Sequence, residues 1–257
     1  MRVVARSDAG LAREVNEDYV FIDESLGLVA VADGQGGVVT GVLAARLAVE
    51  GVRQALDQAD LAIDPEQQLR QALPAVDRMV FDAVQSEGRS LDASILTRLD
   101  EDAMAILEMV RAGRGTLRAM HSALALAVLA DDEIVVAQVG HCRAYRLART
   151  SLTRLFATRP WWVDAANMLG TGAAAPDVAR VRMLDGERLL LCTDGLHSAV
   201  DEAAIEKHAE HESLDAAVDT LMERAKPTAT DNIALAILEV GGEPLASWRN
   251  ASPYQKR

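Results

Sequence analysis

The sequence predicts an α+β fold, a layered and largely antiparallel domain in which β-sheets are covered by helices. Two observations predict it. Three strand-like segments open the chain before a pair of helical segments, and a longer run of strand-like segments in the middle precedes a second helical pair. Strands that occur in runs, with helices in pairs between them, are typical of antiparallel sheets rather than of strictly alternating parallel ones.

The first half of the chain supplies the opening strands and the first helices. Val, Ile and Phe are frequent in three short stretches that turn residues separate. The apolar period then becomes helical, and Pro65 marks the start of a second helix because proline is favoured in a first turn. The expected elements are strands at 3–7, 18–22 and 28–33 and helices at 38–56, 65–84 and 99–112, with a polar, irregular segment at 86–98.

The second half begins with strand-like segments that are most simply a meander of hairpins. Residues 158–177 form an irregular connection of a length that is usually functional or mobile. We expect residues 1–241 to form a single domain and residues 242–257 a C-terminal tail. The expected elements are strands at 119–129, 134–139, 142–147 with a candidate extension at 152–156, 180–183, 188–193 and 233–240, and helices at 201–211 and 213–225.

Composition limits the classes of partner. The chain has 257 residues, half of them apolar, with 39 acidic residues against 26 basic ones. Its negative field would repel nucleic acid, so we expect no nucleic-acid partner. No run of about 18 apolar residues is present that could span a membrane. The N-terminus is charged from its second residue, which does not resemble a secretion signal. We therefore expect a cytoplasmic protein with no membrane partner. Cys142 and Cys192 lie in apolar strand-like segments and are expected to be buried free thiols.

Four short segments each place an acidic residue where a strand gives way to a turn. One such segment alone is usually just a turn, because Asp and Gly both favour that geometry. Two of the preceding strands, at 29–32 and 189–192, are wholly apolar, so Asp33 and Asp194 are expected to project from one end of a sheet. Carboxylates are the hard oxygen ligands that magnesium and manganese prefer. The four segments are Asn16-Glu17-Asp18, Asp33-Gly34-Gln35, Thr193-Asp194-Gly195 and Thr230-Asp231-Asn232.

These segments resemble successive motifs of the type 2C, metal-dependent protein serine/threonine phosphatase (PPM) family, in the family's order and in its bacterial form. The resemblance covers residues from about 3 to 240. It implies a four-layer α-β-β-α sandwich of two mostly antiparallel sheets flanked by helices. The matching segments are Ser7-Asp8-Ala9-Gly10 with Arg13 and 16–18, Asp33-Gly34-Gln35-Gly36-Gly37, Gly115-Thr116, 139–146, 191–196 and Thr230-Asp231-Asn232-Ile233.

The resemblance also implies an activity, the hydrolysis of phosphoserine and phosphothreonine in proteins, with two Mn²⁺ or Mg²⁺ ions. Asp33 would bridge the ions and Gly34 would offer its carbonyl oxygen, while Asp194 and Asp231 would complete the shell of the second ion. Two such cations about 3.5 to 4 Å apart lower the pKa of a bridging water, which can then attack phosphorus. No nucleophilic side chain is required.

Three further residues take roles from the same resemblance. Glu17 and Asp18 would hold metal-bound waters in place, and Arg13 would clamp the phosphate. An arginine fork suits phosphate oxygens better than the point charge of a lysine. Asp8 and Asn232 are expected to support these groups.

The chain departs from the family's pattern at Gly140-His141-Cys142-Arg143, where relatives carry Gly-Asp-Ser-Arg. The missing aspartate leaves a third metal site in doubt. Imidazole can bind manganese or iron, but the interpretation we favour is an ordinary hydrogen-bonded histidine at a strand end.

The region beside the expected site departs from the pattern too. The flap at 158–172 is shortened, and residues 86–113 are longer than usual, which suggests an added helix. Trp161 and Trp162 form either an aromatic rim or a pair with one ring packed on the core.

The partners implied are phosphoprotein substrates of a serine/threonine kinase, and we expect a monomer. The altered motif and the short flap keep open an alternative, a catalytically weak or inactive module that binds phosphoproteins or a kinase.

Overall fold

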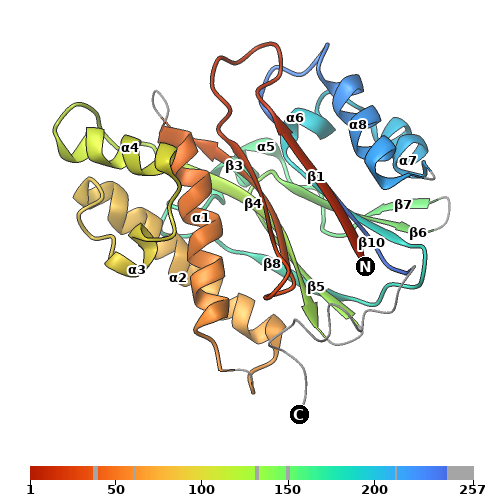
Figure 1. Cartoon of the computed structure of the whole chain (residues 1–257), viewed down its shortest axis with the longest axis horizontal. Coiled ribbons are helices and arrows are strands. Elements are labelled where there is room, and N and C mark those ends of the chain that lie inside the picture. The colour runs from red at the N-terminus through yellow and green to blue at the C-terminus, as the bar shows by residue number, and fades with distance from the viewer. Residues whose placement is uncertain (37–39, 61, 131–132, 149–150, 212, 242–257) are drawn as a thin grey trace.

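The strands form two five-stranded antiparallel sheets in this computed structural model (Figure 1), which describes residues 1–36, 40–60, 62–130, 133–148, 151–211 and 213–241. The first sheet has the order β1 (Arg2–Asp8), β10 (Ile233–Glu239), β9 (Arg188–Cys192), β6 (Arg143–Ala148) and β7 (Ser151–Arg154). The second has the order β2 (Asp18–Asp23), β3 (Leu28–Gln35), β4 (His121–Ala130), β5 (Glu133–Val139) and β8 (Asp177–Val181).

The two sheets pack face to face. Alternate residues of a strand point to opposite sides of its sheet, and in these sheets both sides are apolar. Val29 and Val31 of β3 lie in the core between the sheets with Leu189 and Leu191 of β9. The alternate residues of β3, such as Ala30, belong to a second core under helices. A third core lies on the far side of the first sheet. The predicted four-layer sandwich is confirmed.

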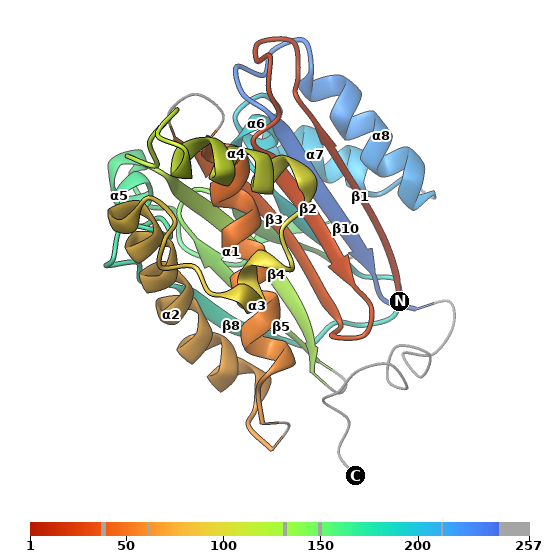
Figure 2. The same ribbon diagram turned by 60° about the vertical axis from the view of Figure 1, so that its left-hand side comes forward.

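Helices cover both outer faces (Figures 1 and 2). Several begin at the acidic or hydroxyl caps that the sequence carries; Asp64, for example, accepts a hydrogen bond from the backbone of Glu66. The second sheet is covered by α1 (Thr40–Asp57) and α2 (Pro65–Ser86), with α3 (Ala93–Leu96) and α4 (Glu101–Arg111) beside them. The first sheet carries α6 (Asp194–His197), α7 (Glu202–Ala209) and α8 (Leu214–Ala225), and α5 (Trp161–Ala166) lies in the connection from β7 to β8.

Three local predictions were wrong. The segment predicted to be irregular at 86–98 contains α3, which Asp92 caps by accepting from two backbone amides. The connection at 158–177 contains α5, which begins after Pro160. The strand predicted to reach Thr193 ends at Cys192, because Asp194 already begins α6.

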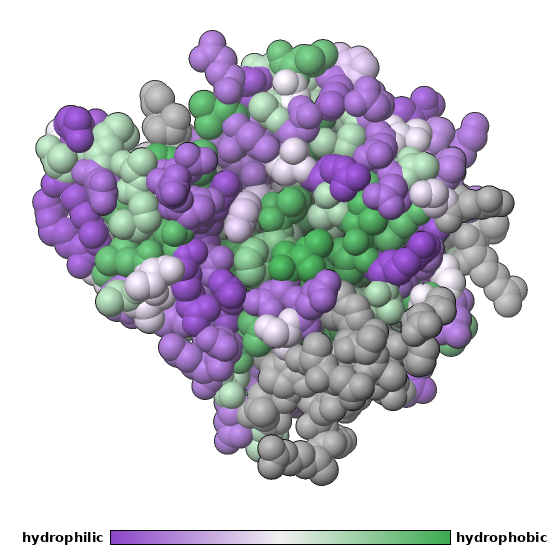
Figure 3. All heavy atoms as spheres, in the orientation of Figure 1, coloured by the Kyte–Doolittle hydropathy of each residue, from purple (hydrophilic) through white to green (hydrophobic). Residues whose placement is uncertain are grey.

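The first and last strands hold the two ends of the described chain together. β1 pairs with β10 along its whole length, from Arg2 opposite Glu239 to Asp8 opposite Ile233. Figure 3 shows apolar side chains gathered over the strands between α1 and α8, with polar side chains around them. The predicted tail at 242–257 lies outside the described residues, and the domain boundary at 241 stays a prediction. Within the described ranges, no helix combines the length and the apolar character needed to cross a bilayer.

Candidate active site

Two carboxylates meet where β2 pairs with β3. The antiparallel register sets Asp18 directly opposite Asp33, and both side chains are buried. The hydroxyl of Thr193, at the end of β9, donates to Asp18 Oδ2 at 2.7 Å. Burial raises the pKa of Asp18 well above its ordinary value, and the negative charge of Asp33 raises it further.

A third carboxylate reaches Asp33 from the other sheet. Oxygens of Asp33 and Asp194 and a ring nitrogen of His141 all lie within 4.8 Å of one another. The predicted meeting at one end of a single sheet was therefore wrong. Asp33 lies on β3 and Asp194 follows β9, so the two carboxylates meet across the sandwich at the ends of facing strands.

Asp231 lies next to this cluster because two turns cross at a glycine. A Cβ on Gly195 would lie 1.9 Å from the carbonyl oxygen of Asn232, so only glycine permits the turn after Asp194 to approach so closely. Burial raises the pKa of Asp194 to about 6, against the lowering effect of His141, and the charges of Asp33 and Asp231 add to the rise.

A second close crossing sets Glu17 at the start of α1. A Cβ on Gly34 would lie 1.9 Å from the carbonyl oxygen of Gly41. The Gly34 amide donates to the Glu17 carbonyl at 3.2 Å, and the Gly41 amide donates to Glu17 Oε1 at 2.9 Å. Burial raises the pKa of Glu17, and the Gly41 hydrogen bond opposes that rise.

Arg13 lies on the loop of residues 9–17, which joins β1 to β2. Its Nη2 donates to Asp231 Oδ2 at 2.8 Å, and its side chain is 48% exposed. Asn232 holds this loop: its amide donates to the carbonyls of Ala9 and Val15 at 3.0 and 2.9 Å, and its Oδ1 accepts from the Glu17 amide. The support expected from Asn232 is thus visible as hydrogen bonds.

His141 lies in the turn between β5 and β6. Its Nε2 is 2.8 Å from Asp33 Oδ2. Burial alone would lower the pKa of His141, but the hydrogen bond to Asp33 and the charge of Asp33 raise it. The hydrogen bond agrees with the interpretation that the sequence favoured, while the position adds a nitrogen to the cluster of carboxylate oxygens.

His197 supports His141 from α6. Its Nε2 donates to the His141 carbonyl at 2.9 Å. Burial lowers the pKa of His197 to about 3, which keeps the ring neutral, and the carbonyl acceptor requires the proton on Nε2. No residue spacing connects His197 or Thr193 to the cluster in advance; the signal that could have found them is their nearness in the chain to Asp194.

The donor set fits divalent cations. Asp194 Oδ1 is buried and has no hydrogen-bond partner among the described residues. Buried carboxylates at such close quarters repel one another, which raises their pKa values, and a cation between them would relieve that repulsion. Clustered carboxylate oxygens suit magnesium and manganese, and an added imidazole suits manganese better than magnesium.

The two tryptophans lie at the start of α5 and both face solvent. Trp161 is 76% exposed and Trp162 60%, and their rings meet edge to face with centroids 6.1 Å apart. The interpretation in which one ring packs on the core was wrong, because the segment is helical and neither ring turns inward. Their role as a rim stays a prediction.

The sequence profile of one family, described as Protein phosphatase 2C, matches residues 12–236. The chain belongs to the protein phosphatase 2C family. The matched range contains all seven predicted site residues, which are Arg13, Glu17, Asp18, Asp33, Gly34, Asp194 and Asp231.

Curated protein phosphatase 2C relatives are similar along most of this chain. The serine/threonine phosphatase stp of Listeria welshimeri is 25% identical over 268 residues, which cover 93% of this chain and 96% of that protein. The serine/threonine protein phosphatase PstP of Mycobacterium tuberculosis is 24% identical over 264 residues. That match covers 93% of this chain but 45% of PstP, so the chain spans about half the length of the mycobacterial relative.

Solved structures share the fold. The crystal structure of PstP from M. tuberculosis superposes with a TM-score of 0.75 at 22% identity, covering 94% of this chain and 99% of that one. The catalytic domain of PstP in complex with two manganese ions gives a TM-score of 0.73 at 22% identity, covering 93% and 98%. The α+β sandwich of this chain is therefore the fold of these phosphatases.

Proposed function

We propose that this chain is a metal-dependent protein phosphatase that hydrolyses phosphoserine and phosphothreonine with two Mn²⁺ or Mg²⁺ ions. The observation that carries the proposal is that Asp194 meets Asp33 from the other sheet, with Asp231 close enough for its charge to raise the pKa of Asp194. Membership of the protein phosphatase 2C family supports it, as does the pair of manganese ions in the complex of the PstP catalytic domain.

Four residues would hold the ions. Asp33, whose oxygen lies within 4.8 Å of ligand atoms of Asp194 and His141, would bridge the two ions, and Gly34, the next residue on β3, would offer its carbonyl oxygen. Asp194 and Asp231 would complete the second ion's shell. When bound there, a pair of divalent cations lowers the pKa of water, so that hydroxide is available near neutral pH to attack phosphorus.

The chain's own side chains would bind and orient the phosphate. Arg13 could take this role at little cost, because its ion pair with Asp231 is partly exposed and such pairs contribute only about 0 to 1 kcal/mol. The guanidinium can therefore turn from Asp231 to the phosphate oxygens. Glu17 is fixed by the Gly41 amide and Asp18 by the Thr193 hydroxyl, so both carboxylates are oriented before substrate arrives.

The proposal extends to the setting of the reaction. The substrates would be phosphoproteins modified by a serine/threonine kinase, and the enzyme would act as a monomer in the cytoplasm. Its acidic surface, with 39 acidic residues against 26 basic ones, would disfavour nucleic acid as a competing polyanion.

The test is manganese-dependent release of phosphate from a phosphothreonine peptide. The wild-type chain should release phosphate, and Asp194→Ala should lower kcat at least about a hundredfold, because removing a ligand disrupts the metal pair. Glu108→Ala, which removes an exposed carboxylate on α4, is the control and should leave the rate unchanged. A folded wild-type chain with no activity at millimolar manganese would instead favour the phosphoprotein-binding module.

A further inference from the structure

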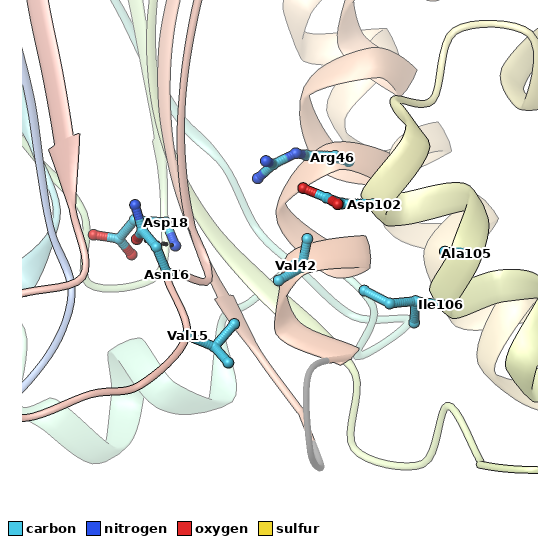
Figure 4. Close-up of a pocket in the computed structure, with 8 residues that line it drawn as sticks. All are labelled: Val15, Asn16, Asp18, Val42, Arg46, Asp102, Ala105 and Ile106. Atoms are coloured by element: carbon cyan, nitrogen blue, oxygen red, sulfur yellow. Dashed lines mark hydrogen bonds between the residues drawn. The ribbon is translucent and has the colours of Figure 1, made fainter.

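A cavity of about 510 Å³ opens beside the active site, between the 9–17 loop, α1 and α4 (Figure 4). Val15 and Asn16 line it from the loop, and Arg46 lines it from α1. Asp102 and Ile106 line it from α4, and Figure 4 shows Asp102 projecting from α4 toward α1. The wall that α4 provides belongs to the segment at 86–113 that is longer than expected for the family.

The cavity adjoins the active site. Asp18, which lies opposite Asp33, also lines the cavity. Asn16 lines it too, and its Oδ1 accepts from the backbone amide of Asp18 at 3.2 Å. A polypeptide whose phosphorylated residue lay at the carboxylate cluster would therefore bring a neighbouring side chain to the mouth of this cavity.

The cavity has apolar walls and one acidic side chain without a partner. Val15 is partly exposed and Ile106 half-buried, so both offer apolar surface. Asp102 is exposed and forms no hydrogen bond or ion pair with any other residue that the structure describes.

The arginine in the cavity wall is largely buried and has partners for its Nε and its guanidinium face, while its Nη1 has no hydrogen-bond partner among the described residues. Arg46 Nε donates to Asp100 Oδ2 at 2.8 Å, and the guanidinium lies 4.0 Å from the centre of the Tyr19 ring. Its side chain is only 14% exposed. Asp100 offsets the positive charge of Arg46, which leaves the carboxylate of Asp102 to set the sign of the field at the cavity mouth.

We propose that this cavity is a specificity subsite that binds the lysine or arginine side chain of a substrate next to the phosphorylated residue. The aliphatic stem of such a side chain packs along Val15 and Ile106, and its charged head reaches Asp102. An acidic side chain is repelled there, and a short apolar one leaves the carboxylate unpaired. The inference rests on the proposed phosphatase function and adds to it a substrate class, phosphopeptides with a neighbouring basic residue.

Binding of peptides that cannot be hydrolysed tests the subsite apart from catalysis. The peptides carry a phosphonate analogue of phosphoserine among alanines, with a single arginine placed in turn at each neighbouring position on either side. Kd is measured by fluorescence anisotropy with manganese present. At one position or more, arginine should tighten binding to the wild-type chain roughly three- to tenfold over alanine, as expected for a partly screened ion pair with added stem contacts. Glutamate at that position should weaken binding.

Two variants decide whether Asp102 is responsible. Asp102→Asn should abolish the preference for arginine and leave the affinity for the all-alanine peptide unchanged. Glu101→Gln is the matched control, because Glu101 lies in the same first turn of α4, is exposed and does not line the cavity. It should keep the preference.

The proposal is overturned if arginine gives no gain at any position, if Asp102→Asn keeps the gain, or if Glu101→Gln removes it equally. Hydrolysis of p-nitrophenyl phosphate, which has no neighbouring side chain, reports separately on the phosphatase function. Failure of that reaction together with an arginine preference that depends on Asp102 would refute the catalytic proposal and leave the subsite standing.

Discussion

At the scale of single residues, His141 is the side chain that most distinguishes this site. It brings an imidazole nitrogen to within 4.8 Å of oxygens from Asp33 and Asp194, where relatives carry a carboxylate. Replacing an oxygen donor by nitrogen changes which ion a site prefers, because magnesium strongly favours oxygen while manganese accepts imidazole. The metal preference of this chain should therefore depend on one position.

His141→Asp should shift that preference toward magnesium. In the wild-type chain we expect manganese to raise Tm more than magnesium does at equal concentration, and in the variant the difference should narrow. Differential scanning calorimetry measures the rise in Tm that each metal causes, and the measurement does not depend on catalytic turnover. His211→Asp, an exposed histidine on the far side of the first sheet, is the control. An unchanged difference between the two metals in His141→Asp would contradict a ligand role for the imidazole.

Thr193 should matter for stability more than its size suggests. Its hydroxyl donates to Asp18 Oδ2 at 2.7 Å and accepts from the Ala234 amide at 2.9 Å, and the residue is fully buried. Thr193→Val keeps the volume but leaves both partners without a hydrogen bond, so it should lower the free energy of unfolding by about 1 to 3 kcal/mol. Urea unfolding in the presence of a chelator measures this. Thr153→Val, exposed on β7, should change it by less than about 0.5 kcal/mol.

At the scale of elements, α2 fixes part of the connection from β7 to β8. Asp77 on α2 is buried and accepts three backbone hydrogen bonds: Oδ1 from Gly170 and Gly172 at 2.7 and 3.0 Å, and Oδ2 from Ala174 at 3.0 Å. One carboxylate thus provides the acceptors that this irregular backbone lacks within itself. The connection is anchored to a helix rather than left free beside the site.

Asp77→Asn should release this connection. An amide has one oxygen to accept with, so at least one backbone N–H loses its partner, at a cost of about 1 to 3 kcal/mol. Hydrogen exchange of residues 170–174 should quicken while exchange in the sheets stays slow. Asp82→Asn, at a half-exposed position on the same helix that pairs with Arg78 rather than with the connection, should leave the pattern unchanged. If hydrogen exchange became equally faster in the sheets, Asp77 would instead support the whole fold.

The elements also show how far the sequence could predict this molecule. Periodicity predicted most strands and the major helices, because apolar alternation reflects burial on each face. It could not show that Asp33 and Asp194 lie in different sheets, since strand order depends on which faces pack together. The contact between His141 and Asp33, 108 positions apart, carries no local signal either. The same holds for the three amides that Asp77 binds.

At the scale of the whole molecule, metal binding and folding should be coupled. Carboxylates from β2, β3, the start of α6 and the turn before β10 are crowded together, so a cation that binds the folded chain stabilises it. Manganese at about 100 times its Kd should add roughly 2.7 kcal/mol and raise Tm by several degrees. A chelator should reverse the change, and Asp33→Asn should abolish it. A Tm that does not respond to manganese would contradict the coupling.

The place of β10 in the first sheet has a consequence for synthesis on the ribosome. β10 lies between β1 and β9, and Asn232, just before β10, holds the 9–17 loop by hydrogen bonds. β1 therefore waits for β10, and the edges of β1 and β9 that face β10 stay unpaired until nearly the entire domain has emerged. A nascent chain would have no complete carboxylate cluster, so the proposed phosphatase activity would begin only after β10 had left the exit tunnel.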